Sequence, residues 1–286
     1  MSAEYAVTST DSHVPLADLI ARATAADGVA PLSEQFVLHL TDNALAVADE
    51  SGVVGLIAYD GESAEMVVDP DRRRRGIATA LYAALESTAV PVWAHGNLPA
   101  ARAVAAAWGF RVVRELLVLA RPLAAVESVA LPAGYELLDL ATSRVVHADT
   151  DAQWLRVNNE AFSWHPEQGG WDSERLAAAQ QPAWFTPENV LLLWHGDELA
   201  GFHWLKIPLQ PAGVTGEVYV IGLADRFRGR GLSRPLLVAG LSHLSSRGCQ
   251  RVILYVEADN EVAVGVYRNL GFETVESHCL YAPPTA

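Results

Sequence analysis

The most regular alternation of apolar and polar positions lies between residues 217 and 248. Val218 and Val220 alternate with other side chains and predict a half-buried strand. The basic, glycine-containing stretch 225–231 ends that strand. From Leu232 onward, apolar residues recur at the three- and four-residue spacing of a helix. The pattern therefore predicts a strand, a tight basic turn and a helix in direct succession.

The same succession occurs earlier in the chain. Residues 65–68 predict a strand, and four consecutive arginines, 72–75, then precede Gly76 and an Ala/Leu-rich helix that runs to about residue 86. Gly109-Phe110 and Gly271-Phe272 end two further helical patterns in corresponding places. We infer an internal repeat of one α/β (α+β) unit, each copy a mostly antiparallel mixed sheet flanked by helices.

The remaining periodicity completes the two copies, which we expect to span residues 1–129 and 130–286 around a linker at 122–132. Helices are predicted at 15–26, 32–40, 97–108, 154–162, 173–180 and 261–270. Strands are predicted at 4–8, 44–48, 53–59, 90–95, 112–120, 135–140, 190–194, 199–206, 251–257 and 274–280.

Composition narrows the class of protein. The chain has 286 residues, 51% of them hydrophobic, and a formal charge of −14, which favours two ordinary domains with real cores and argues against nucleic acid as a partner. Cys249 and Cys279 form neither a disulfide framework nor a zinc pattern, so we expect a reducing, cytoplasmic setting and no metal. No membrane-spanning run and no signal peptide are evident, and we expect a monomer that does not bind membranes.

The basic turns indicate a site for an anion. A helix that begins directly after such a turn directs unpaired N–H groups and a partial positive charge at one point. Gly229 and Gly231 let the backbone approach a ligand closely, and Arg228, Arg230 and Arg234 add charge. A pyrophosphate is the natural ligand of this arrangement, whereas a basic turn that binds nothing is the alternative.

The loop Arg228-x-x-Gly231-x-Ser233 resembles the acyl-CoA pyrophosphate loop of the GCN5-related N-acetyltransferases, the GNAT family. Arg73-x-x-Gly76-x-Ala78 matches the family pattern fully, whereas Ser233 departs from it at the last position but is small. The resemblance implies two tandem GNAT-fold domains and an acyl-CoA ligand.

The two copies differ where that family carries its chemistry. Tyr267 stands one helical turn before Gly271, where family members have the tyrosine that is assigned as general acid for the departing thiolate. The first copy has Ala105 there, so we expect only the second copy to be catalytic; the alternative is that Tyr267 is a packing residue. Glu217 opens the key strand and could accept the proton of an attacking amine. Counting places Glu62 at the corresponding position, so a solvated strand-edge glutamate remains the alternative.

A narrower resemblance covers essentially the whole chain. The segments 156–172, with Asn-Glu-Ala-Phe, His-Pro and Gly-Gly-Trp, and 254–260 resemble the mycothiol synthase family, tandem GNAT proteins of actinobacteria. The resemblance implies acetylation of the cysteinyl amine of a cysteine–glucosamine–inositol conjugate by acetyl-CoA. An acetyltransferase acting on another amine and a non-catalytic acyl-CoA-binding module are the alternatives.

The resemblance also implies the site residues. The acceptor would be bound by Glu34, Glu160, Lys206, Glu217 and Tyr255, with Glu217 as base and Tyr267 as acid. Acetyl-CoA would contact Ile221, Gly222, Leu223, Arg228, Gly229, Arg230, Gly231, Leu232, Ser233, Arg234, Asn260, Glu261, Val262, Ala263, Val264 and Gly265. A vestigial site in the first copy would be lined by Met66, Val67, Val68, Arg73, Arg75 and Gly76. A contact from Glu34 would place the acceptor site between the domains, although the residues alone favour the first turn of a helix for Glu34.

Overall fold

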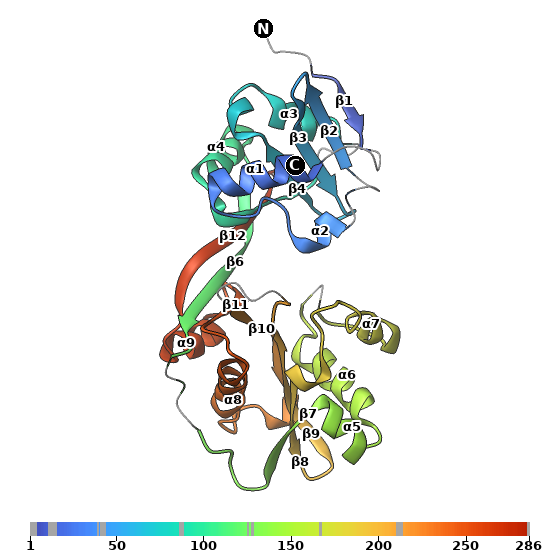
Figure 1. The fold of residues 1–286 in the computed structure, drawn as a ribbon, viewed down its shortest axis with the longest axis vertical. Helices are drawn as coiled ribbons and strands as arrows, with labels where there is room; N and C mark the ends of the chain where they lie inside the picture. The colour runs from blue at the N-terminus through green and yellow to red at the C-terminus, as the bar shows by residue number, and fades with distance from the viewer. Residues whose placement is uncertain are drawn as a thin grey trace. The chain divides into compact units, whose positions relative to one another are not determined.

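The computed structural model describes residues 5–10, 16–38, 40, 44–85, 89–124, 126, 129–165, 168–209 and 214–284. The chain divides into two compact units (Figure 1). The first contains Met1–Leu117, Glu257–Asn260 and Glu276–Ala286, and the second contains Val118–Val256 and Glu261–Val275. The strands β6 (Arg111–Pro122) and β12 (Glu273–Ala282) therefore contribute residues to both units. The domain limits inferred from the sequence, 1–129 and 130–286, stay a prediction.

The first unit is a mixed sheet with helices on both faces. Its strands β1 to β5 and the end of β12 follow the order β1-β2-β3-β4-β5-β12, in which β4 and β5 are parallel and the other neighbours antiparallel. The bounds are β1 (Val7–Ser9), α1 (Leu16–Asp27), α2 (Glu34–Leu38), β2 (Ala44–Asp49), β3 (Gly52–Tyr59), β4 (Ala64–Val68), η1 (Pro70–Arg72), α3 (Ile77–Ala83), β5 (Val92–Ala94), η2 (His95–Asn97) and α4 (Pro99–Trp108).

Strand β3 shows why this unit's apolar runs are nearly continuous. Leu56 packs into the cluster that contains Leu19 of α1, whereas the next residue, Ile57, packs into the cluster that contains Ile77 and Leu81 of α3. Both faces of the strand are covered, so every position from Val53 to Ala58 is buried.

The second unit repeats this architecture. Its strands follow the order β11-β10-β9-β8-β7, and β10 and β11 form the parallel pair. The bounds are β7 (Tyr135–Asp139), α5 (Leu140–Val146), α6 (Thr150–Ala161), α7 (Ser173–Ala178), η3 (Pro187–Asn189), β8 (Val190–His195), β9 (Glu198–Lys206), β10 (Thr215–Leu223), η4 (Asp225–Phe227), α8 (Ser233–Ser246), β11 (Arg251–Glu257) and α9 (Glu261–Asn269).

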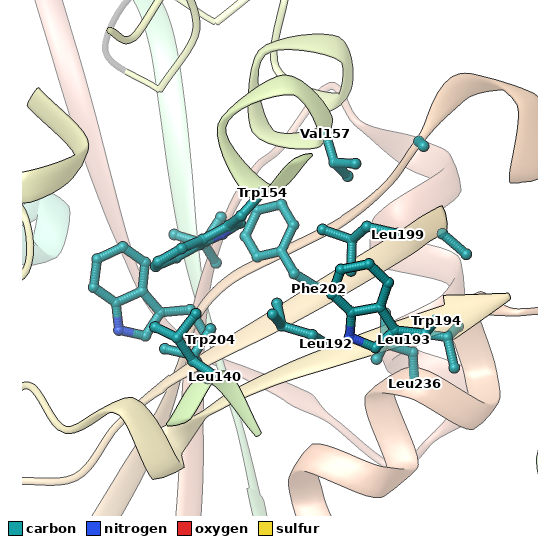
Figure 2. Close-up of a cluster of buried hydrophobic side chains, with 14 of the residues drawn as sticks. Leu140, Trp154, Val157, Leu192, Leu193, Trp194, Leu199, Phe202, Trp204 and Leu236 are labelled. Atoms are coloured by element: carbon teal, nitrogen blue, oxygen red, sulfur yellow. The ribbon is translucent and has the colours of Figure 1, made fainter. Parts of the chain in front are cut away.

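Large aromatic side chains fill the second unit's core. Trp154 and Val157 point from α6 onto the sheet, and the Trp154 ring lies 6.1 Å from that of Phe202 and 5.2 Å from that of Trp204 (Figure 2). On the opposite face, α8 packs against β9 and β10, with Leu236 fully buried. Burying several such rings, each worth roughly 2–3 kcal/mol of apolar transfer free energy, stabilises the sheet that presents β10.

The structure confirms the predicted strand–turn–helix succession in both copies and corrects some helix limits. Helix α5 was missed, because its seven residues show little periodicity; its signal is Asp139, whose carboxylate accepts a hydrogen bond from the Thr142 N–H and caps the helix. The helix predicted at 154–162 begins four residues earlier, at Thr150, and α2 is shorter than 32–40. Residues 4, 15, 39 and 86 of the predicted elements lie outside the described residues.

Candidate active site

Strand β10 changes its pairing in the middle. Against β9, its register shifts between Val218 and Val220, which marks a β-bulge. Against β11, it pairs only from Thr215↔Arg251 to Val218↔Leu254, although it continues to Leu223. Within the described residues, Ile221–Leu223 therefore pair with β9 on one side only. Their other edge presents backbone groups that a thioester carbonyl and its pantetheine-type chain can bond.

The basic loop after β10 opens directly onto α8. Gly229 and Gly231 have φ angles of 73° and 74°, which favour glycine, and a Cβ at either position would meet open space. The residue before α8, Leu232, provides no side-chain cap for the helix. This 14-residue helix thus begins directly after the basic loop without a side-chain cap, and its positive dipole end suits an anion such as an acyl-CoA pyrophosphate.

The arginines of this loop also hold it in shape. The Arg228 guanidinium lies 3.2 Å from an Asp225 carboxylate oxygen and donates to the Glu160 and Ala161 carbonyl oxygens at 3.4 Å. The Arg230 guanidinium lies 5.2 Å from the centre of the Phe227 ring. Contacts of these two side chains with acetyl-CoA stay predictions.

Glu160 supports the same loop from α6. One of its carboxylate oxygens accepts a hydrogen bond from Arg156 at 2.8 Å, and the other accepts one from the Asp225 N–H at 3.2 Å. These contacts connect helix α6 to the start of the basic loop. The substrate contact expected of Glu160 stays a prediction, and its observed partners give it a structural part in the acyl-CoA loop.

Tyr267 lies on α9 with its ring half-buried and 5.7 Å from that of Phe272. Within the described part of the chain its hydroxyl makes no hydrogen bond, and burial raises the pKa of Tyr267 to about 12. The Phe272 N–H donates to the Tyr267 carbonyl at 3.1 Å, and the Phe110 N–H donates to the Ala105 carbonyl at 2.9 Å. This shared contact makes Ala105 the structural counterpart of Tyr267, so the first copy has a methyl group where the second has a phenol.

Three of the five predicted acceptor residues face the same side of the second sheet. Lys206 and Glu217 are directly opposite each other in β9 and β10, so their side chains share a face. Glu217 also pairs with Ile253 of β11, and Tyr255, two residues further on, points to the same side. The Tyr255 side chain is 46% exposed, which leaves it accessible to a ligand.

The bulge corrects the sequence match between Glu62 and Glu217. Val218 pairs with Leu205 as Ala64 pairs with Tyr59, so the residue that corresponds to Glu217 is Ser63. Counting from the arginines was shifted by one residue because β10 holds an extra residue and β4 shows no register shift. The first copy therefore has a hydroxyl where the second has a carboxylate.

The predicted residues of the first unit are largely engaged with one another. Met66, Val67 and Val68 lie on β4, but the Arg73 guanidinium binds both Asp27 oxygens, at 2.8 and 2.6 Å, and this ion pair raises the pKa of Arg73. Arg75 donates to the Asp71 carbonyl at 3.3 Å. Gly76, with φ 87°, directly precedes α3. An acetyl-CoA site in this unit stays a prediction.

The remaining predicted residues are placed at helix starts. Glu34 is the exposed first residue of α2, consistent with the first-turn position foreseen as an alternative. Asn260 donates its N–H to the Glu257 carbonyl at 3.1 Å directly before α9, and the predicted acetyl-CoA residues 261–265 form the first turn and a half of that helix. Val262 is 81% exposed whereas Val264 is buried, so backbone groups and only some side chains are open to a ligand.

One polar cluster was missed from the sequence. In the first unit, His95 lies 2.9 Å from a Glu65 carboxylate oxygen and 2.9 Å from the His278 ring nitrogen, and Glu65 accepts the Ser33 N–H at 2.6 Å. Burial, and then the neighbouring His95, lower the pKa of His278 to about 4. The residues are too far apart in the chain for any spacing to reveal them. Through Ser33 the cluster holds the start of α2, next to Glu34.

Two further features of the described residues concern membranes and metals. Among the described residues, no helix is both long and apolar enough to cross a lipid bilayer. In that same part of the chain, His, Cys, Asp and Glu side chains do not gather in threes that could hold a metal ion.

Comparison with known proteins identifies the chain in two stages. Residues 154–272 match the acetyltransferase (GNAT) family. Over its whole length the fold is similar to a GCN5-related N-acetyltransferase from Sphaerobacter thermophilus (TM-score 0.71, 21% identity, 99% of this chain and 97% of that one). It is also similar to a tandem GNAT protein from the clavulanic acid biosynthesis pathway (TM-score 0.69, 18% identity, 99% and 100%). The fold and the matched segment define a protein of the GNAT class with two GNAT-fold units.

The sequence relatives are more specific. The chain is 47% identical over 285 residues to the mycothiol acetyltransferase of Corynebacterium aurimucosum, and the match covers 93% of each chain. The chain belongs to the mycothiol acetyltransferase family. This confirms the narrower resemblance drawn from segments 156–172 and 254–260.

Proposed function

We propose that this protein transfers the acetyl group of acetyl-CoA to the cysteinyl amine of a cysteine–glucosamine–inositol conjugate, the last step of mycothiol biosynthesis. The reaction takes place in the second unit. The neutral amine nitrogen attacks the thioester carbonyl carbon, a C–N bond forms, and the C–S bond breaks. The proton lost by the amine passes to Glu217, directly or through a water. An α-amino group has a pKa of about 8, so a weak base is sufficient.

Backbone and side-chain groups bind the two substrates and stabilise the charges that develop in the reaction. The N–H groups at the open edge of Ile221–Leu223 polarise the thioester carbonyl, and the start of α8 with Gly229 and Gly231 binds the pyrophosphate. The Tyr267 hydroxyl donates a hydrogen bond to the departing thiolate. Glu217 and Lys206, on one sheet face, bind the hydroxyl-rich acceptor, because carboxylate and ammonium groups suit hydroxyl hydrogen bonds.

The difference between the two copies supports this assignment most. The second unit has a bulged β10 with Glu217, and Tyr267 on α9, whereas in both units the basic loop opens on a helix without a side-chain cap. The first unit has Ser63 and Ala105 at the corresponding positions, and Arg73 is neutralised by Asp27. Hence the first unit lacks both the carboxylate that would accept the amine proton and the phenol that would hydrogen-bond the thiolate.

Turnover tests the proposal directly. Purified protein, acetyl-CoA and the conjugate should release free CoA thiol and give a product heavier by one acetyl group. Acetylation only of other amines would leave a GNAT enzyme with a different substrate. Acetyl-CoA binding without turnover on any amine would support the binding module instead.

A matched pair of variants tests which unit is catalytic. Gly231 and Gly76 both have positive φ in open space, so Gly231→Val and Gly76→Val impose the same strain in the two copies. Gly231→Val should weaken acetyl-CoA binding by about tenfold or more, because phosphate–amide hydrogen bonds at about 1.5–3 kcal/mol each are lost. Gly76→Val should keep kcat within about twofold. A larger loss of kcat in Gly76→Val, with the fold intact, would assign chemistry to the first unit.

We further propose that the protein works as a cytoplasmic monomer. Both cysteines, Cys249 and Cys279, are buried free thiols, which suits a reducing compartment. Light scattering during size-exclusion chromatography measures the mass directly, and the mass of a dimer would overturn the second half of this proposal.

A further inference from the structure

An aromatic cluster reaches from the second unit's core to its surface beside the β10 bulge. The Tyr219 ring lies 5.0 Å from the ring of Trp184 and 5.1 Å from that of Trp204, with interplanar angles of 66° and 72°. Trp204 is 1% exposed, whereas Tyr219, the extra residue of the bulge, is 40% exposed. Tyr219 stands two residues after Glu217, on the same side of the strand, and its ring reaches the surface beside Trp184.

The positively charged side chain of Lys206 packs against the same cluster. The Lys206 ammonium lies 4.9 Å from the centre of the Trp184 ring, within the range of a cation–π interaction. Lys206 shares its sheet face with Trp204, two residues earlier on β9, and with Glu217 directly opposite on β10. An ammonium, a carboxylate and partly open aromatic rings therefore lie on one face within a few ångströms of one another.

This combination suits a ring that is apolar on its faces and polar at its rim. The C–H groups of a pyranose or cyclitol can lie against Tyr219 and Trp184, and its hydroxyls can bond to charged groups at the edge. An exposed aromatic patch with a few convergent polar groups is the usual composition of a small-molecule site. Distance favours the same ligand, because Lys206 and Glu217 side chains start about 5 Å apart. An amine held at Glu217 therefore brings the sugar that follows it over Lys206 and Trp184.

We propose that Trp184 and Tyr219 form the specificity surface for the sugar–cyclitol part of the acceptor, and that Trp184 also positions the Lys206 ammonium. This rests on the proposed function, in which the amine is placed at Glu217. The surface selects the acceptor and takes no part in the transfer of the acetyl group. It therefore acts on the affinity for the conjugate and leaves the chemistry of a plain cysteinyl amine unchanged.

Two acceptors separate recognition from chemistry. One is the complete cysteine–glucosamine–inositol conjugate, and the other is L-cysteine methyl ester, which has the amine but no sugar. In Trp184→Leu, kcat/KM for the conjugate should fall by about 10- to 30-fold, as expected for a buried aromatic contact. For the methyl ester, kcat/KM should change by about twofold or less, as should the KM for acetyl-CoA. Trp184→Phe, which keeps a ring, should recover part of the loss.

Trp108→Leu is the matched control. Trp108 is also half-buried and packs against aromatic neighbours, with ring centres 4.9 Å from Tyr82 and 5.3 Å from Phe110, but it lies in the first unit's α4. This variant should lower the melting temperature without changing the ratio of the two kcat/KM values. If Trp184→Leu does not fold, Tyr219→Ser at the more exposed ring gives the same test.

The outcomes distinguish the two proposals. The glucosamine–inositol part alone should inhibit the wild type competitively against the conjugate, with a Ki that rises about tenfold or more in Trp184→Leu. A wild type that does not acetylate the conjugate refutes the proposed function itself. A wild type that does, together with variants that keep the conjugate's advantage over the methyl ester or lose both acceptors equally, refutes the specificity surface.

Discussion

Replacing Tyr267 by phenylalanine removes only the hydroxyl that is assigned to the departing thiolate. The ring can keep its contact with Phe272 at 5.7 Å, and within the described residues the hydroxyl makes no hydrogen bond that would be lost. We therefore expect the free energy of unfolding to change by less than about 0.5 kcal/mol. A loss of activity in Tyr267→Phe then reports on chemistry.

The size of that loss follows from the pKa of Tyr267. Burial raises this pKa to about 12, whereas the departing thiol has a pKa of about 8.5 if it resembles cysteine. Complete proton transfer from the phenol would therefore be unfavourable by about 5 kcal/mol. Tyr267 instead stabilises the thiolate with a hydrogen bond, worth about 1.5–3 kcal/mol to a charged acceptor. We expect kcat to fall by about 10- to 150-fold in Tyr267→Phe, well short of the roughly 10⁴-fold upper range of general acid catalysis.

Single-turnover release of CoA thiol measures the chemical step, and calorimetry measures acetyl-CoA affinity, which should be unchanged. Tyr82→Phe is the control: it removes a hydrogen bond of 2.9 Å to the Val90 carbonyl in the first unit, so it should lower the melting temperature and leave kcat unchanged. Because a phenol with a raised pKa stays protonated, Tyr267 should add no downward limb to the rate profile up to about pH 11. Equal single-turnover rates in wild type and Tyr267→Phe, or a loss confined to acetyl-CoA binding, would refute this reasoning.

Three further predictions concern stability and the acyl-CoA loop. In α8, a Cβ at Gly240 would overlap the fully buried His203 ring, so Gly240→Ala should lower the free energy of unfolding by about 2 kcal/mol. A Cβ at Gly265 in α9 would meet open space, so Gly265→Ala should raise the free energy of unfolding by up to about 1 kcal/mol. Equal effects of the two variants in thermal unfolding would contradict the overlap. The pKa of His278 is lowered to about 4 in the folded protein, so the unfolded chain protonates this histidine at a higher pH than the folded chain does. The free energy of unfolding should therefore fall by up to about 3 kcal/mol as the pH drops from about 6.5 to 4, and it should not change above pH 7. Urea unfolding of His278→Gln should show a smaller fall, and an identical pH dependence would exclude this residue. Glu160→Gln weakens the carboxylate bond to the backbone N–H that begins the basic loop, so acetyl-CoA affinity should fall by about tenfold with kcat retained; loss of acceptor affinity alone would favour the substrate contact.

Much of the architecture could be predicted because it depends on local spacing. The period-2 pattern around Val218 and the helical repeat from Leu232 required no knowledge of distant residues. The repeated basic loops and Gly-Phe helix ends indicated two copies, and the match of Ala105 to Tyr267 was confirmed by the same carbonyl contact in both. Helix α5 escaped, because a seven-residue helix shows too little periodicity and its Asp139 cap is a common residue in any turn.

The residues that each arginine and glutamate of the basic loops contacts, by contrast, depend on the tertiary structure. Arg73 and Arg228 occupy the same place in one motif, yet Arg73 is paired with Asp27 of α1 and Arg228 contacts the end of α6. Glu160 proved to hold the basic loop, a contact across 65 residues of chain. No spacing rule relates such segments, because they meet only through the packing of helices on the sheet.

The sequence by itself therefore determined the type and order of most elements, the duplication and the second copy's phenol. The tertiary structure alone decided where β10 bulges, which makes Ser63 the counterpart of Glu217, and it brought Tyr219 beside Trp184. The physical reason is that strand and helix periods are set by neighbouring residues. The register between strands, and the partner each charged or aromatic side chain finds, depend instead on the packing of the whole sheet.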